Sequence, residues 1–306
     1  FQLFKYLEFT FRVLIKFNDH DIYHCNDLQT LPVGILLKIF SLRKVKIVYD
    51  AHEYETEING LGRLEQVLRR WLERALIRFV DKTITVSDSI GEEYAKLYGI
   101  EKPEIILNIP SLSSESKHDL FRQNLGRSAS TEIYLYQGNL SPGRGIRVLL
   151  EVFDKIAGVS RAIVFMGYGD LEEEIKTRAE NSDSIYYHEA VSADQIPQFT
   201  SSADIGISTI ENTCLSYYYC LPNKLFEYLM AEIPVIVSTL PEMGKLVREY
   251  GLGVVANENS VTGISQALEE MDRFDRAAFI KAIGPFKSRY NWEAQEEMLV
   301  SIYTNI

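Results

Sequence analysis

The sequence predicts an α/β protein with two doubly wound domains, in which the strands of a parallel sheet alternate with helices. The chain has 306 residues, 46% of them hydrophobic, and a chain of this length usually divides into two compact domains. From residue 131 onward, short runs of β-branched and aromatic residues alternate with amphipathic segments of helical length. The predicted strands are apolar on both faces, as expected where helices cover both sides of a parallel sheet.

The second half of the chain shows this alternation most regularly. Strands are predicted at 132–137, 162–166, 184–188, 204–208, 234–238 and 253–256, and helices at 145–157, 170–180, 192–201, 223–231 and 241–249. In such sheets ligands bind beyond the carboxyl ends of the strands. We therefore expect functional residues in the loops after residues 137, 166, 188 and 208.

The first 109 residues repeat the alternation with fewer strands. Helices are predicted at 1–17, 30–41, 61–79 and 88–98, and strands at 21–25, 45–49, 82–86 and 104–107. The polar stretch 111–130 is typical of a linker with a weak helix. We predict an N-terminal domain at 1–109, a C-terminal domain at 110–286 and a helix at 287–306 that packs across the domains.

The composition argues against several classes of protein. A net charge of −11, almost all of it after residue 110, disfavours a nucleic-acid partner. The cysteines Cys25, Cys214 and Cys220 lack metal-ligand spacing and are too few for a disulfide scaffold, which favours a cytoplasmic location. The sequence has no run of about 18 uncharged apolar residues, so no membrane-spanning helix is predicted.

Two glycine-rich turns follow predicted strands. In the first, Gly138, Gly143 and Gly145 allow close approach to an anion, and Arg144 adds guanidinium donors at the start of a helix. A plain strand–helix turn with a solvated arginine is the alternative. The second turn contains Gly167 and Gly169. A lone Gly-x-Gly is weak evidence for a binding loop, and a plain tight turn explains it equally well.

The segment 220–238 carries the most specific pattern. Pro222 sets the helix entry, Asn223 is a candidate cap, and Lys224 and Glu227 stand three apart on one helical face. Lys224 and the helix dipole suit a diphosphate, and the two oxygens of Glu227 suit a ribose diol. The alternative is an exposed ion pair of little energetic consequence.

A fourth group, Asp50, His52, Glu53 and Glu55, follows the strand 45–49. Its position at a strand's carboxyl end favours a functional site over a structural histidine. The Asp19-His20-Asp21 triplet precedes its strand, at the wrong edge of the sheet for a nucleotide-bound metal. His20 and His24 are about 13 Å apart along an extended chain, too far for a zinc pair. No metal site is predicted.

These motifs together resemble the GT-B glycosyltransferases, specifically glycosyltransferase family 4, bacterial enzymes of surface-polysaccharide assembly. The resemblance rests on DIYHCNDL (21–28), VYDAHEYE (48–55), ILNIP (106–110), YQGNLSPGRGI (136–146), FMGYGD (165–170) and PNKLFEYLMAEIPVIVS (222–238). It implies two Rossmann-like domains facing a cleft. The chain begins with Phe1, and the family's first strands and Gly-rich acceptor loop have no counterpart, so an incomplete N-terminal domain is expected.

The resemblance also implies roles for individual residues. His52, Arg144, Lys224 and Glu227 match catalytic positions, with Arg144 on the donor diphosphate, Glu227 on the ribose and His52 facing the transferred sugar. The implied donor-binding set is Gly138, Asn139, Gly143, Arg144, Gly167, Gly169, His188, Val191, Tyr219, Asn223, Lys224 and Glu227. The implied acceptor-side set is Asp27, His52, Glu53 and Tyr54.

Two positions depart from the family pattern. Tyr219 stands where a second glutamate is usual, and Glu211 is a candidate substitute if its loop folds inward. Asn139 replaces a basic residue, which leaves more of the diphosphate charge to Arg144.

The implied activity is a hexosyl- or N-acetylhexosaminyl-transferase that moves a sugar from a nucleotide sugar, a UDP-sugar, to a surface glycan or lipid-linked acceptor of lipopolysaccharide or capsule. Retention of anomeric configuration, with neither metal nor other cofactor, is expected. A GT-B sugar-nucleotide epimerase and a non-catalytic glycosyltransferase-like subunit are the alternatives.

Helix 61–79 suggests contact with a membrane surface. It carries five arginines, Arg63, Arg69, Arg70, Arg74 and Arg78, beside an apolar stripe of Leu64, Leu68, Trp71, Leu72 and Leu76. A basic amphipathic helix can lie on an anionic bilayer, here the inner face of the cytoplasmic membrane. A core-facing helix with a solvated basic rim is the alternative.

Overall fold

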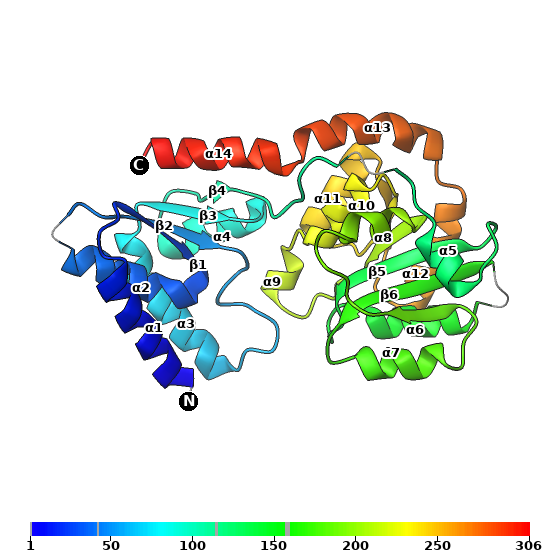
Figure 1. The fold of residues 1–306 in the computed structure, drawn as a ribbon, viewed down its shortest axis with the longest axis horizontal. Helices are drawn as coiled ribbons and strands as arrows, with labels where there is room; N and C mark the ends of the chain where they lie inside the picture. The colour runs from blue at the N-terminus through cyan, green and yellow to red at the C-terminus, as the bar shows by residue number, and fades with distance from the viewer. Residues whose placement is uncertain (1, 42, 114–115, 157–159) are drawn as a thin grey trace. The chain divides into compact units, whose positions relative to one another are not determined.

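The computed structural model describes residues 2–41, 43–113, 116–156 and 160–306 (Figure 1). The chain forms two compact units. Unit 1 contains the residues up to Leu107 together with Cys214–Cys220 and Glu296–Ile306, and unit 2 contains Asn108–Thr213 and Leu221–Gln295. The two units replace the continuous domains expected from the sequence, because a short internal segment and the end of the last helix cluster with unit 1.

Unit 1 is built around a parallel sheet. Its elements are α1 (Gln2–Lys16), β1 (Ile22–Asn26), α2 (Asp27–Phe40), β2 (Lys46–Ala51), α3 (Arg63–Leu76), the 3₁₀ helix η1 (Ile77–Phe79), β3 (Lys82–Thr85), α4 (Asp88–Tyr98), β4 (Glu104–Ile105) and α9 (Leu215–Tyr218). The strand order is β1-β2-β3-β4. The described strands therefore follow one another in a single direction across the sheet.

Unit 2 has the doubly wound order predicted from the sequence. Its elements are α5 (Leu120–Leu125), β5 (Glu132–Asn139), α6 (Ile146–Asp154), β6 (Arg161–Tyr168), α7 (Glu172–Ala179), β7 (Ile185–His188), α8 (Ile196–Ser201), β8 (Ile205–Ser208), α10 (Asn223–Met230), β9 (Val235–Val237), α11 (Pro241–Tyr250), β10 (Gly253–Val255), α12 (Val261–Asp272) and α13 (Arg276–Arg289). All strands are parallel, in the order β10-β9-β8-β5-β6-β7. From β5 the chain adds β6 and β7 on one side and then crosses over to add β8, β9 and β10 on the other, so the switch point lies between β5 and β8. Ligands of such sheets bind at this switch point.

Both faces of the unit 2 sheet are covered. Residues 133–137 of β5 and 162–167 of β6 are all buried, and apolar side chains of both strands share one core cluster with residues of α6 and α12. Burial on both faces confirms the interpretation of continuous apolar runs as parallel strands. The last residues of these strands, 138–139 of β5 and 168 of β6, are exposed.

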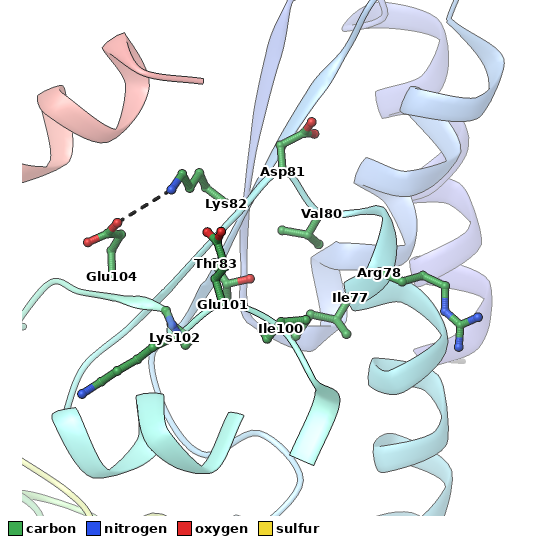
Figure 2. Close-up of a pocket in the computed structure, with 11 residues that line it drawn as sticks. Ile77, Arg78, Val80, Asp81, Lys82, Thr83, Ile100, Glu101, Lys102 and Glu104 are labelled. Atoms are coloured by element: carbon green, nitrogen blue, oxygen red, sulfur yellow. Dashed lines mark ion pairs between the residues drawn. The ribbon is translucent and has the colours of Figure 1, made fainter. Parts of the chain in front are cut away.

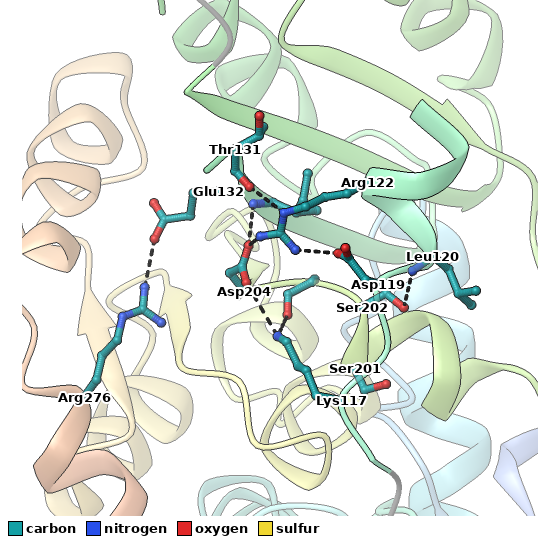
Figure 3. Close-up of polar contacts among 12 residues, drawn as sticks. Lys117, Asp119, Leu120, Arg122, Thr131, Glu132, Ser201, Ser202, Asp204 and Arg276 are labelled. Atoms are coloured by element: carbon teal, nitrogen blue, oxygen red, sulfur yellow. Dashed lines mark hydrogen bonds and ion pairs between the residues drawn. The ribbon is translucent and has the colours of Figure 1, made fainter. Parts of the chain in front are cut away.

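The second part of the predicted linker 111–130 packs against the rest of unit 2. Arg122 of α5 donates to Asp119 at 2.7 Å, to the Thr131 carbonyl at 2.8 Å, and to Asp204 (Figure 3). Leu120 N–H donates to Ser202 Oγ at 3.2 Å. These bonds specify the helix that the polar sequence only weakly suggested. Residues 114–115 of the predicted linker, and the end of the predicted helix 145–157, lie outside the described residues.

The last helix, α14 (Trp292–Thr304), belongs to unit 2 through residue 295 and to unit 1 from residue 296. Trp292 N–H donates to the Pro110 carbonyl at 3.0 Å, and Leu112 N–H donates to Glu293 at 2.9 Å. Helices α9, α12 and α13 were not predicted, although Ser260 caps α12 by accepting from Gly263 N–H at 3.0 Å. Among the described helices, none has both the length and the hydropathy that crossing a membrane demands.

Candidate active-site residues

The β5–α6 turn of unit 2 has a backbone that requires glycine. Gly138, Gly143 and Gly145 have φ of +105°, +83° and +75°, in the region that L side chains rarely adopt. A Cβ on Gly145 would lie 2.0 Å from the Thr209 carbonyl oxygen. Glu211 closes the turn, since its backbone N–H donates to the Gly143 carbonyl and its Oε1 accepts from Gly145 N–H at 3.1 Å.

The candidate role of Glu211 in place of the family's second glutamate at the donor sugar stays a prediction. In the structure its carboxylate holds the glycine-rich turn. The physical reason is that Gly145 precedes α6, where backbone N–H groups have no partner within the helix and attract a carboxylate.

The β6 loop packs directly against the β5 turn. Gly138 and Gly167 are register partners, and a Cβ on Gly167 would lie 1.9 Å from the Gly138 carbonyl oxygen. A Cβ on Gly169 would lie 2.5 Å from the Leu140 carbonyl oxygen and 2.9 Å from Asn139 Oδ1. These two glycines are thus required by loop packing, whether or not a ligand contacts them.

Lys224 lies buried under the glycine-rich turn. Only 7% of its surface is exposed, and its Nζ sits 3.6 Å from the centroid of the Tyr136 ring. A Cβ on Gly138 would be 3.7 Å from Lys224 Cε and 3.9 Å from Nζ. This burial contradicts the alternative of an exposed ion pair with Glu227. It places the ammonium group next to the backbone of Gly138.

The entry of α10 differs in detail from the prediction. Pro222 occupies the cap position, with φ −76° and ψ 144°, and Asn223 is the first helical residue. The exposed Asn223 is therefore not the cap. Since proline carries no side-chain acceptor, the first N–H groups of α10 receive no cap bond from it.

Glu227 stands one turn into α10 and is half-buried. Its Oε2 accepts from Gln137 Nε2 at 2.5 Å. Burial raises the pKa of Glu227, whereas the Gln137 hydrogen bond and the Lys224 charge act in the opposite direction. Arg144, in the turn itself, is also half-buried. The residues predicted for the diphosphate and ribose thus come from β5, its turn and α10, around the switch point.

His188 is the last residue of β7, and Val191 lies in the loop that follows it. The His188 ring lies 4.8 Å from the Phe199 ring and 6.0 Å from the Phe121 ring, and its Nδ1 is 2.7 Å from the Glu189 carbonyl. The rings of Phe121 and Phe199 lie 5.7 Å apart, so the imidazole and the two phenyl rings form one aromatic cluster. Half-buried Val191 follows it.

Tyr219 is not brought together with the other predicted donor residues inside unit 2. It lies in the Cys214–Cys220 segment of unit 1, with its ring 5.0 Å from that of Tyr218 and packed against the apolar cluster of unit 1. The spacing from Glu227 along the sequence could not reveal this change of unit.

A second group of predicted residues meets at the carboxyl edge of the unit 1 sheet. His52 Nδ1 lies 3.3 Å from Asp27 Oδ1, and His52 Nε2 lies 3.5 Å from Asp50 Oδ2. The Asp27 hydrogen bond raises the pKa of His52, and His52 in turn lowers the pKa of Asp27. Asp27 has φ of +60°, a conformation that costs a non-glycine residue about 1–2 kcal/mol.

Glu55 completes this cluster from the buried side. It is 3% exposed, and burial followed by the Asp27 charge raises the pKa of Glu55 to about 8. His24 extends the cluster in the other direction, because its Nε2 lies 3.0 Å from Asp50 Oδ2 and its Nδ1 contacts the Tyr303 hydroxyl. Sequence reasoning missed Tyr303 and the role of His24, since they come from elements far apart in the chain.

The two remaining acceptor-side predictions have different outcomes. Glu53 is exposed beside His52. Tyr54 is only 3% exposed and its ring packs 5.7 Å from that of Tyr94, so its side chain belongs to the core of unit 1 beside the predicted acceptor-side residues. An aromatic residue shortly after a strand can lie either in the core or in a surface site, and Tyr54 lies in the core.

Features away from these sites have simpler explanations. His20 Nδ1 and Asp19 Oδ1 lie 2.9 Å apart, and both side chains are exposed. Among the described residues, no group of three or more His, Cys, Asp or Glu side chains is placed to hold a metal ion. A pocket lined by Val80, Asp81, Lys82 and residues 100–104 opens where β3 begins, at the edge opposite the carboxyl ends (Figure 2). Its Lys82–Glu104 ion pair spans 3.8 Å.

Known family models match both halves of the chain. The family described as Glycosyltransferase Family 4 matches residues 3–109, and the family described as Glycosyl transferases group 1 matches residues 131–272. The chain carries the two domains of a GT-B glycosyltransferase and resembles family 4. Like the solved GT-B glycosyltransferases below, it is an α/β protein with two parallel sheets.

Two relatives illustrate the sequence similarity. A chitobiosyldiphosphodolichol beta-mannosyltransferase of Debaryomyces hansenii is 24% identical over 84% of the chain and 61% of that enzyme, so the chain spans about three fifths of its length. An uncharacterized glycosyltransferase of Methanocaldococcus jannaschii is 23% identical over 95% of the chain and 76% of that protein.

Two solved structures illustrate the fold. HepE of Anabaena in complex with UDP has a TM-score of 0.78 and 15% identity, covering 98% of the chain and 82% of HepE. Sucrose-phosphate synthase of Thermosynechococcus elongatus has a TM-score of 0.80 and 16% identity, covering 99% of the chain and 78% of that enzyme.

Proposed function

We propose that this glycosyltransferase moves a sugar from a UDP-sugar to a hydroxyl of a growing surface glycan or lipid-linked acceptor of lipopolysaccharide or capsule. The observation that carries the proposal is the buried Lys224 ammonium beside Gly138 at the switch point of unit 2. The complexes of HepE with UDP and UDP-glucose support a UDP-sugar as the donor. The name of the Debaryomyces hansenii relative, which contains diphosphodolichol, supports a lipid-linked acceptor.

The chemistry requires stabilisation of a leaving diphosphate. As the bond between the anomeric carbon and the phosphate oxygen breaks, negative charge grows on the diphosphate. Arg144, Lys224 and the N-terminus of α10 supply positive charge and N–H donors for it. The acceptor oxygen bonds to the anomeric carbon, and its proton passes to the leaving phosphate. Neither a metal nor a protein base is needed, and the configuration is retained.

The unit 1 cluster is proposed to serve the acceptor side. The His52 imidazole lies between Asp27 and Asp50, and the Asp27 hydrogen bond raises its pKa. An imidazole carries a ring N–H donor in either protonation state. Such a donor suits a sugar hydroxyl. Asp27 and Glu53 are the nearby carboxylates available to acceptor hydroxyls.

Calorimetric titration with UDP and GDP, with and without Mg²⁺, tests the donor site. We expect magnesium-independent binding of UDP that Arg144→Ala weakens at least tenfold, because a charged hydrogen-bond donor is lost. Arg147→Ala is the matched control, since Arg147 is an exposed arginine in the first turn of α6 that pairs with Glu174 at 2.9 Å. Equal effects of the two variants, or no UDP binding, would refute the assignment.

Turnover separates the remaining possibilities. A transferase consumes the UDP-sugar only when an acceptor is added, whereas a sugar-nucleotide epimerase would convert the donor without one. A non-catalytic subunit would release no UDP under either condition. The product's anomeric configuration, read by NMR, decides whether the transfer is retaining.

We propose further that α3 rests on an anionic membrane surface, at the cytoplasmic face of the cytoplasmic membrane. Leu64, Val67, Leu68 and Trp71 are 58–74% exposed and recur at helical spacing. The predicted stripe is corrected at Leu72 and Leu76, which pack against the core of unit 1. Exposed Arg63 and Arg78 supply positive charge toward anionic headgroups.

Cosedimentation with vesicles tests this surface. Vesicles rich in phosphatidylglycerol should retain the chain more than neutral phosphatidylcholine vesicles do, and Trp71→Ser should reduce retention. Ile280→Ser, at a 70% exposed position on α13, is the control and should change nothing. Equal retention on both vesicles, or equal loss in both variants, would refute the proposal.

A further inference from the structure

The last residues of β5 include a buried amide that the proposed chemistry does not use. Gln137 directly precedes Gly138 and is 3% exposed. A buried side-chain amide is normally hydrogen-bonded, and both ends of this one are. Its Nε2 donates to Glu227 Oε2 at 2.5 Å, and its Oε1 lies 2.8 Å from Thr200 Oγ1.

The chemistry of the partners fixes the orientation of the amide. An ionised carboxylate only accepts hydrogen bonds, so the NH₂ group of Gln137 must face Glu227. The amide oxygen then faces the fully buried Thr200 of α8, whose hydroxyl proton is shared with the Ile196 carbonyl at 2.7 Å. The backbone N–H of Gln137 donates to Tyr228 Oη at 2.9 Å. Besides its bond to Glu227, Gln137 is therefore held by α8 through its side chain and by Tyr228 of α10 through its main chain.

This arrangement restricts how Glu227 presents its carboxylate. A free glutamate rotates about its last bonds, but here one oxygen is tied to an amide whose own direction is set by Thr200. The second oxygen and the remaining lone pairs stay available for hydroxyl donors. The bond also favours the ionised carboxylate against the burial that opposes it.

We propose that Gln137 is a positioning residue for ribose recognition, which, braced by Thr200, orients the Glu227 carboxylate toward the two ribose hydroxyls of the donor. The inference rests on the proposed function, because that function assigns Glu227 to the ribose. Gln137 and Thr200 are thereby added to the proposed donor site as the residues that make the Glu227 carboxylate selective for a diol.

The experiment compares UDP with 2′,3′-dideoxy-UDP, which lacks both hydroxyls, by calorimetry on the purified chain. Gln137→Met should weaken UDP binding about tenfold, as expected for loss of a hydrogen bond to a charged group, and leave dideoxy-UDP binding unchanged within about twofold. Thr200→Val should act in the same direction with a smaller effect. UDP binding by Gln137→Met should also begin to fall at a higher pH than in the wild type as the solution is acidified.

Tyr228→Phe is the matched control. It removes the hydroxyl that holds the Gln137 backbone but leaves the Gln137–Glu227 bond, so any effect should be equal for the two ligands. Circular dichroism confirms folding, and Thr200→Val decides if Gln137→Met does not fold.

The outcomes separate the inference from the proposed function. Equal weakening of both ligands by Gln137→Met and by Thr200→Val, or no change in UDP binding, overturns the positioning role while leaving the donor site intact. Wild-type protein that binds neither nucleotide overturns both.

Discussion

Replacing Gly145 by alanine tests whether the glycine-rich turn is built as the structure shows. At φ +75° any side chain costs about 1–2 kcal/mol. The new Cβ would also lie 2.0 Å from the Thr209 carbonyl oxygen and 2.5 Å from Thr209 Oγ1. Relieving such overlap in a packed region costs about 1–3 kcal/mol more. The free energy of unfolding of unit 2 should therefore fall by about 2–5 kcal/mol.

Gly251→Ala is the matched control for this change. Gly251 ends α11 in the same unit with φ +64°, but no atom lies within 4 Å of the Cβ it would gain. Only the conformational cost of about 1–2 kcal/mol should remain. Urea unfolding followed by circular dichroism measures both variants. Equal destabilisation would show that Thr209 does not confine the turn, and the reasoning would fail.

Three further predictions concern the unit 1 cluster. Asp27→Asn should lower the pKa of His52 toward its ordinary value, as measured by NMR titration, because the largest cause of the raised pKa is lost; Asp21→Asn, at an exposed position, should not. Between the ordinary glutamate pKa and about 8, folded Glu55 retains a proton that the unfolded chain releases. The free energy of unfolding of unit 1 should therefore fall as the pH rises through this window. Glu55→Gln should flatten that slope, whereas Glu53→Gln should preserve it. Tyr303→Phe should loosen residues 296–306 by about 1 kcal/mol in hydrogen exchange, because the contact with His24 is lost, whereas Thr304→Val, whose hydroxyl bonds within α14, should not; unchanged protection would contradict this.

The segments of the proposed donor site are predictable from the sequence because their information is local. Gly138, Gly145, Lys224 and Glu227 lie in two short segments, each directly after a predicted strand or at a helix start. Strand positions follow from apolar runs, and the parallel-sheet rule then places these segments at one edge. The error in these segments, the cap at Asn223, concerns which residue precedes the first helical turn, and no periodicity encodes that.

The supporting contacts were not predictable because they join distant segments. Gln137 and Glu227 are 90 residues apart, and His24 and Tyr303 are 279 apart. A glutamine at a strand end or a tyrosine near the last residues has many ordinary explanations, and only the fold selects among them. Tyr54 and Tyr219 show the converse, since position beside a motif suggested a site and packing placed both against the core of unit 1.

Net charge and local charge point in opposite directions at the proposed donor site. The chain carries a net charge of −11, most of it after residue 110, yet the turn expected to hold a diphosphate contains Arg144 with Lys224 buried beneath it. Exposed acids more than about 8–10 Å away are largely screened at physiological ionic strength, whereas a buried ammonium is screened much less. Local burial rather than overall composition therefore sets the field that a phosphate meets, and an acidic chain can still bind a polyanionic donor.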